Sequence, residues 1–172
     1  MRYVMQQKFW AWGDQLHVYD EQHQPVFWAK GRVFSWGHQL SFQDMQGNEL
    51  AFIKQKLMTW MSQYEIHRDG QRFAQVRKNF TWFTKKFTLE MVEGDSLVIQ
   101  GDFWDHRYQF RCDDRVVAKV DKAYWAWTDT YGIETEEGED DVAILCSTIV
   151  IDKILDDQQR RRSNSSSPLS PP

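Results

Sequence analysis

The chain has 172 residues, of which 41% are hydrophobic and 15% aromatic, and its formal net charge is −4. This length suits one domain with a single core, and the many aromatic residues exclude a wholly disordered chain. The acidic balance argues against a nucleic acid partner, because proteins that bind duplexes present a strongly basic face. The charge is uneven, however. Residues 1–90 carry 12 Lys and Arg against 8 Asp and Glu, whereas residues 91–172 carry 9 against 17, so the first half is where we expect a basic patch.

The first elements in chain order are hairpins that recur every 24 residues. Gln15–Asp20 is echoed by Gln39–Asp44 and again by Gln63–His67. Large apolar residues alternate with polar ones in each segment, and this period of two predicts half-buried strands. A turn signal follows each strand. Asp69-Gly70 is the strongest of these signals, because Gly accepts the positive φ of a two-residue hairpin turn.

Further alternating segments predict the strands that return from each turn and continue the sheet. They are Val26–Lys30, Leu50–Lys54, Phe73–Arg77, Phe87–Met91, Leu97–Gln100, Tyr108–Asp113, Val116–Val120, Ala123–Trp127 and Tyr131–Glu134. Together with the first three, they make ten to twelve antiparallel strands. That many strands form either a sandwich or a barrel.

The last element is an apolar run, Val142–Ile151, that is hydrophobic on every face. A helix with this pattern has to be buried on all sides. From Val142 to Leu155 it would measure roughly 21 Å, about the height of a barrel made of six-residue strands. Residues 139–141 are acidic and suit a helix N-terminus, and Ser147 and Thr148 can bond the carbonyls four residues earlier. We therefore predict a mainly β fold, a closed antiparallel barrel of about twelve strands around a buried C-terminal hydrophobic helix.

We expect one domain over residues 1–156 and a disordered tail over residues 157–172, because the tail has little to bury. The two cysteines, Cys112 and Cys146, lack the spacing of a metal or redox site. The N-terminus lacks a secretory signal, and no segment has the roughly 20 apolar residues that cross a bilayer. We therefore expect a cytoplasmic monomer that is not transmembrane and has no cofactor.

Several segments in order along the chain resemble the LURP-one-related family: Phe42–Ala51, Ile53–Lys56, Gly101–Asp105 and Trp127–Gly132, followed by the apolar helix. The resemblance covers nearly all of residues 1–156. It implies the tubby C-terminal-like fold that this family shares with phospholipid scramblases, a twelve-stranded barrel around a central hydrophobic helix. It implies much less about activity, because many members of the family have no established biochemical role.

The resemblance also implies a candidate lipid site, because tubby domains bind phosphoinositide headgroups through Lys and Arg on the barrel surface. Candidate residues on the returning strands and nearby loops are Lys54, Lys56, Arg77, Lys78, Lys85 and Lys86. Each cation near a membrane contributes about 1 kcal/mol, so four that converge would hold a weak peripheral contact. The plainer interpretation is that these side chains solvate the strands and prevent edge pairing.

Scramblases also carry a calcium-responsive acidic segment before the terminal helix, which suggests a second candidate site. The acidic residues in this position are Asp129, Glu134, Glu136, Glu137, Glu139, Asp140 and Asp141. Their spacing does not match an EF-hand loop. The plainer interpretation is a solvated loop with acidic residues at a helix N-terminus.

The sequence lacks the common catalytic motifs, including a Gly-x-Ser-x-Gly elbow, a phosphate-binding Gly loop and a His-Glu-x-x-His pair. Asp105-His106 could orient a general base, but adjacent strand residues point to opposite faces. We therefore expect a non-enzymatic protein that binds anionic phospholipid or phosphoinositide headgroups. The alternative is a protein-binding scaffold that works through its aromatic surface or its tail. The Trp series at positions 12, 36, 60, 82, 104, 125 and 127 could form stacking platforms for nucleic acid or carbohydrate, but its placement at the repeat period favours a structural role in barrel corners. Rising salt should weaken the lipid contact and spare the aromatic interface.

Overall fold

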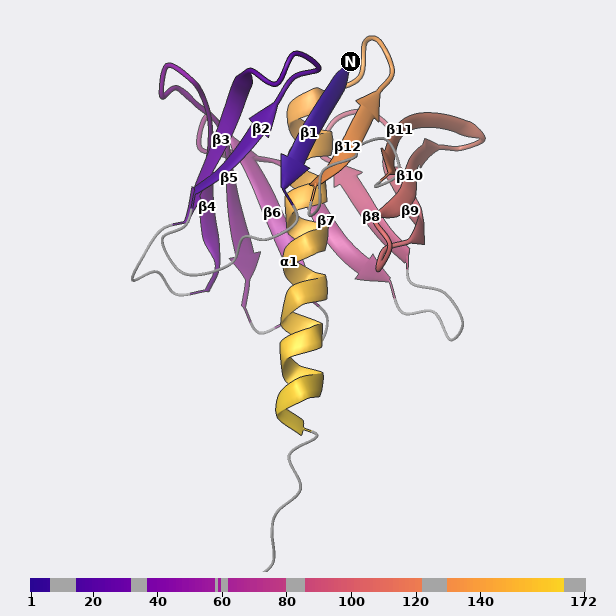
Figure 1. The fold of residues 1–172 in the computed structure, drawn as a ribbon. Coiled ribbons are helices and arrows are strands. Elements are labelled where there is room, and N and C mark those ends of the chain that lie inside the picture. The colour runs from indigo at the N-terminus through magenta and orange to yellow at the C-terminus, as the bar shows by residue number, and fades with distance from the viewer. Residues whose placement is uncertain are drawn as a thin grey trace, which may run out of the picture.

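The computed structural model describes residues 1–6, 15–31, 37–57, 59, 62–79, 86–121 and 130–165, except for the side chains of residues 164 and 165. Within these ranges the chain forms twelve strands and one helix, labelled in Figure 1. The strands are β1 (Arg2–Gln6), β2 (Gln15–Tyr19), β3 (Pro25–Gly31), β4 (Gln39–Asp44), β5 (Glu49–Lys56), β6 (Gln63–Arg68), β7 (Gln71–Asn79), β8 (Lys86–Met91), β9 (Leu97–Asp102), β10 (Arg107–Cys112), β11 (Arg115–Asp121) and β12 (Thr130–Thr135). The helix is α1 (Asp141–Ser165).

The strands form a closed barrel in which each strand pairs antiparallel with the next along the chain. The barrel closes where β1 pairs with β12, from Arg2 opposite Glu134 to Gln6 opposite Thr130. The predicted fold class is confirmed. The sequence patterns did not predict β1. Its main partner, β12, lies about 130 residues later in the chain, so no local hairpin pattern marks this strand.

This strand order gives the barrel two different ends. We call the end that holds the start of α1 the entry end; the tight turns that follow β2, β4, β6, β8 and β10 lie there. We call the opposite end, where α1 leaves the barrel, the exit end (Figure 1). The turn at Asp69 and Gly70 has φ angles of 52° and 76°, the paired positive values that a two-residue hairpin turn requires.

The helix runs through the middle of the barrel, as Figure 1 shows. Every residue from Ala143 to Ile151 is buried, so this stretch has no face toward water. The hydroxyls of Ser147 and Thr148 donate to the carbonyls of Ala143 and Ile144 at 2.7 and 3.0 Å, as predicted. These bonds keep two polar groups satisfied inside an apolar core.

The helix is longer than predicted and corrects the tail boundary. We expected disorder from residue 157, but α1 continues to Ser165. Two ion pairs spaced four residues apart support this extension, Lys153 with Asp157 and Asp156 with Arg160. Positions 158–162 are all Gln or Arg, which are also good helix formers. Residues 166–172 lie outside the described residues.

The strand expected at residues 123–127 and the tryptophans at positions 12, 36, 60, 82, 125 and 127 lie outside the described residues.

Candidate functional site

Four of the predicted lipid-binding residues lie on the outer face of neighbouring strands toward the exit end. Lys54 and Lys56 are exposed near the end of β5, Arg77 is exposed near the end of β7, and Lys86 begins β8. Gln63 of β6 lies between Lys56 and Arg77 in the register, which places these two cations in one row across the wall.

Lys78 does not join this row. It has the same parity along β7 as the buried Ala74 and Val76, so it faces the barrel interior, opposite to Arg77. Burial lowers the pKa of Lys78, and the positive charge of Arg162 lowers it further. Strand alternation could have revealed this separation from the sequence. Lys85 lies outside the described residues.

Carboxylates neutralise part of the outer wall. The guanidinium of Arg77 pairs with Glu90 of β8 at 2.5 Å, and Lys54 lies opposite Glu65 of β6. The register places uncharged residues beside the other two cations: Gln63 opposite Lys56, and Asn79 and Gln100 on either side of Lys86. The wall alone therefore presents a weak positive field.

The helix supplies the stronger positive charge at this end, which the sequence reading missed. Arg160, Arg161 and Arg162 are exposed near the end of α1, and Figure 1 shows that the helix extends past the strands at this end. The guanidinium of Arg162 lies 6.0 Å from the ring centre of Trp104, a side chain that is 42% exposed. The Asp156–Arg160 spacing is the sequence signal that could have extended the helix over these arginines.

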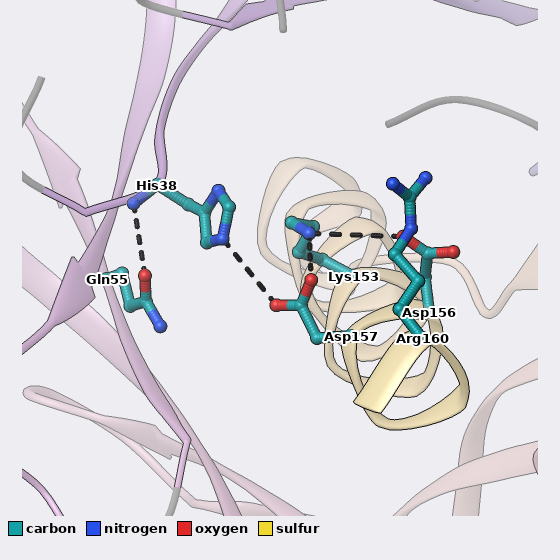
Figure 2. Close-up of polar contacts among 6 residues, drawn as sticks. All are labelled: His38, Gln55, Lys153, Asp156, Asp157 and Arg160. Carbon is teal, nitrogen blue, oxygen red and sulfur yellow. Dashed lines mark hydrogen bonds and ion pairs between the residues drawn. The ribbon is translucent and has the colours of Figure 1, made fainter. Parts of the chain in front are cut away.

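A cluster of polar side chains, which we call the collar, joins one side of α1 to the barrel near the exit end (Figure 2). It contains His38, Gln55, Lys153, Asp156, Asp157 and Arg160. Lys153 is only 4% exposed, and its ammonium pairs with Asp157 and lies 4.0 Å from Asp156. His38 Nε2 lies 3.6 Å from Asp157, and the Gln55 side-chain oxygen accepts the His38 backbone N–H at 3.1 Å. The collar therefore links the helix to β5 and to the residue that precedes β4.

The collar affects the pKa of His38 and the position of α1. Burial lowers the pKa of His38, and the nearby Lys153 ammonium also lowers it, against the opposite effect of Asp157 and Asp156. The buried Lys153 is neutralised by its carboxylate partners, so the collar adds little net charge. Its contacts attach the last turns of α1 to the barrel wall, which fixes the place of the arginines that follow.

The opposite end of the barrel is rich in carboxylates. Its turns and the segment before α1 carry Asp20, Glu21, Asp44, Asp69, Glu93, Asp95, Asp113, Asp114, Glu136, Glu137, Glu139, Asp140 and Asp141. Basic residues at this end include Arg68, Arg72, Arg111 and Arg115. Charge is thus divided along the barrel axis, with an acidic entry end and arginines projecting from the exit end.

The predicted calcium residues at the entry end make structural contacts. Asp140 pairs with Arg68 at 3.0 Å, Glu139 with Arg115 at 2.7 Å and Glu134 with Arg2 at 3.0 Å. Asp141 accepts hydrogen bonds from the Tyr3 and Thr135 hydroxyls, both at 2.6 Å. Glu136 and Glu137 are exposed, and Asp129 lies outside the described residues. Across the described residues, no three His, Cys, Asp or Glu side chains gather closely enough to hold a metal.

The predicted location of the acidic segment at the start of the helix is confirmed. Asp140 Oδ1 accepts the backbone N–H of Ala143 at 2.9 Å, which caps the first turn. Within the described ranges, no helix combines the length and apolar character needed to span a membrane.

Comparison with known proteins places this barrel in a family. The family model described as LURP-one-related matches residues 1–152. A Bacillus subtilis (strain 168) protein described as "Uncharacterized protein YxjI" is 33% identical over 151 residues, which cover 88% of this chain and 91% of that protein. An X-ray structure of an Arabidopsis thaliana protein is similar with a TM-score of 0.64 and 13% identity, covering 90% of this chain and 91% of that one. With its twelve-stranded barrel and central helix, the chain belongs to the LURP-one-related family.

Proposed function

We propose that this protein is a non-enzymatic binding protein that docks peripherally on an anionic phospholipid surface through its exit end. The observation that carries this proposal is the division of charge along the barrel axis. Arg161 and Arg162 project from the exit end, with Lys56 and Lys86 on the nearby wall, while carboxylates crowd the entry end. A molecule with this polarity approaches a negative surface exit end first.

The magnitude of the electrostatic attraction supports a weak, reversible contact. Each Lys or Arg close to an anionic membrane contributes about 1 kcal/mol, and the attraction falls off within roughly one Debye length. The carboxylates of the entry end are separated from the exit end by the length of the strands, so they oppose docking only weakly. Trp104, exposed beside Arg162, adds an aromatic side chain of the kind that favours the headgroup region.

The arrangement of the cations supports recognition of surface charge. They come from three different elements, β5, β8 and α1. Lys78 faces inward and Arg77 pairs with Glu90, so the predicted set does not converge as one cluster on the wall. We therefore expect binding to follow the density of negative charge in the membrane, with little preference among headgroups of equal charge.

Vesicle co-sedimentation tests the proposal. The full chain is mixed at low salt with phosphatidylcholine vesicles, and with vesicles in which a third of the lipid is phosphatidylserine. We expect binding to the anionic vesicles only, and release as salt rises. The double variant Arg161→Gln, Arg162→Gln should weaken the binding by roughly thirtyfold, because two contributions of about 1 kcal/mol are lost.

A matched control separates location from net charge. Arg72→Gln with Arg115→Gln removes the same charge from exposed positions at the entry end. This variant should bind anionic vesicles almost as well as the unmodified chain. Equal losses for the two double variants, or equal binding to neutral and anionic vesicles, would contradict the proposal. Vesicle binding that rising salt left unchanged would contradict it as well.

A further inference from the structure

A second polar cluster lies inside the barrel, on the face of α1 that is turned toward β10 and β12. Asp152 of the helix accepts a hydrogen bond from the Tyr131 hydroxyl through Oδ2. Its other oxygen, Oδ1, lies 3.5 Å from Nδ1 of His106 in the turn between β9 and β10. The His106 and Tyr131 rings stack in parallel, with centroids 4.6 Å apart and planes 9° apart. We call Asp152, His106, Tyr131 and the neighbouring Tyr108 the interior cluster.

The cluster is almost sealed from water. The side chains of Asp152 and His106 are 12% and 8% exposed, and Tyr108 and Tyr131 are buried. Asp152 Oδ1 makes no hydrogen bond within the described structure. A carboxylate in such surroundings is costly unless a cation or a proton compensates it.

No lysine or arginine of the described chain forms an ion pair with Asp152. The adjacent Lys153 turns instead to Asp157 in the collar. Among the described residues, the titratable groups that face Asp152 are His106 from the β9–β10 turn, Tyr108 from β10 and Tyr131 from β12. Burial keeps the pKa of both tyrosines well above their ordinary value, so their hydroxyls stay neutral. His106 is thus the group placed to compensate an ionised Asp152.

From the sequence, Asp105 was the carboxylate that could orient His106 as a general base. In the structure the carboxylate beside His106 is Asp152. Asp105 does not orient the imidazole, because its carboxylate pairs with Arg107 at 2.6 Å on the surface. His106 has a φ of 48°, a left-handed backbone conformation that few non-glycine residues adopt. The turn directs this side chain inward to the helix.

We propose that the interior cluster is a proton-binding site that latches α1 inside the barrel. Asp152 and His106 hold at least one proton between them, either on the carboxyl group or on the imidazole. When that proton leaves, an uncompensated negative charge is left in the core, and the turns of helix around Asp152 loosen. This proposal is independent of membrane docking.

The surroundings of Asp152 determine whether the fold gains or loses stability as pH rises. Burial raises its pKa from 3.8 to about 7, although the Tyr131 hydrogen bond works in the opposite direction. A carboxyl group with a raised pKa in the folded state stabilises the fold fully only below its unfolded pKa. Its contribution is lost as pH rises from about 4 through about 7. Alkaline conditions should therefore loosen the helix.

Hydrogen exchange on the full chain tests the latch. Amide exchange of residues 148–155 is followed between about pH 5 and pH 9, and each rate is divided by the intrinsic rate at that pH. We expect opening of this segment to increase tenfold or more through about pH 7, relative to the β6–β7 hairpin. Asp152→Asn keeps the shape of the side chain and cannot ionise, so its profile should be flat.

Two more variants complete the test. Asp157→Asn changes a carboxylate on the same helix but in the collar, and it should keep the pH dependence of the unmodified chain. Tyr131→Phe removes the donor that stabilises the anion, so it should shift the midpoint to higher pH. The carboxyl carbon of Asp152, assigned by its loss in Asp152→Asn, should titrate by NMR near pH 7. The proposal fails if Asp152→Asn and the unmodified chain give the same profile. It also fails if the midpoint of Tyr131→Phe does not move.

Discussion

Arg68, the last residue of β6, forms a bidentate ion pair with Asp140, the residue that caps α1, and both nitrogen–oxygen distances are 3.0 Å. The Arg68 guanidinium also lies 4.0 Å from the ring centre of Phe73 on β7. Because Asp140 Oδ1 accepts the Ala143 N–H as well, one carboxylate joins the helix to the barrel wall. These contacts attach α1 to the barrel at the entry end, and the collar attaches it at the exit end.

Asp140→Ala should lower the free energy of unfolding by about 1–2 kcal/mol, because the helix loses its cap and Arg68 loses its partner. Urea unfolding followed by circular dichroism measures the loss. Asp105→Ala is the control, since it breaks a pair with Arg107 whose side chains are both more than half exposed. That change should stay within about 0.5 kcal/mol. Equal losses for the two variants would show that the Asp140 contacts do not anchor the helix.

Gly101→Ala should destabilise the barrel much more than Gly47→Ala. Gly101 has a φ of 145°, and a Cβ atom there would lie 2.4 Å from the Arg107 carbonyl oxygen and 2.6 Å from the Tyr108 Cα. Gly47 has a φ of 89°, but a Cβ atom at that position meets no atom within 4 Å. The Gly47 variant should cost about 1 kcal/mol from its backbone conformation alone. Thermal unfolding of both variants measures the difference, and equal changes would contradict the close approach of β9 and β10.

The two cysteines should differ in their reaction with a thiol reagent such as Ellman's reagent. Cys146 is fully buried in α1, and burial raises its pKa, so it should react only after unfolding. Cys112 lies half-buried near Asp95. Desolvation and the charges of Asp95 and Asp113 raise its pKa. Cys112 should therefore react slowly at neutral pH and faster as pH rises.

Asp95→Asn should speed the reaction of Cys112 at neutral pH several-fold, because a neighbouring negative charge is removed. The same variant should leave Cys146 protected in the folded protein. Rapid labelling of Cys146 without denaturant would mean that the helix leaves the barrel readily, which would contradict the close packing of the core.

Local sequence patterns predicted the hairpins and the central helix well. Gln63–His67 and Phe73–Arg77 alternate as strands do, and the Asp69-Gly70 turn between them has the geometry that the dipeptide favours. The apolar run from Val142 to Ile151 is buried as predicted. These features depend on neighbours a few residues away, so the sequence alone is sufficient to identify them.

Predictions that relied on composition were less accurate. The Arg- and Ser-rich end suggested disorder from residue 157, although pairs four residues apart extend the helix to Ser165. The positive first half of the chain suggested a basic patch on one wall. There, however, Arg77 pairs with Glu90 and Lys78 turns inward. Charge is instead divided between the two ends, because sequential antiparallel strands place alternate connections at opposite ends.

The sequence by itself determined the strands, the turns and the need to bury one helix, since hydrophobic periodicity and turn chemistry act over short distances along the chain. Only the tertiary structure decided which side chains the helix meets inside the barrel. Asp152 contacts His106 and Tyr131 because the barrel closes around α1 at one particular depth. The position of α1 along the barrel axis depends on packing and ion pairs between segments far apart in the sequence, so no local sequence pattern predicts it.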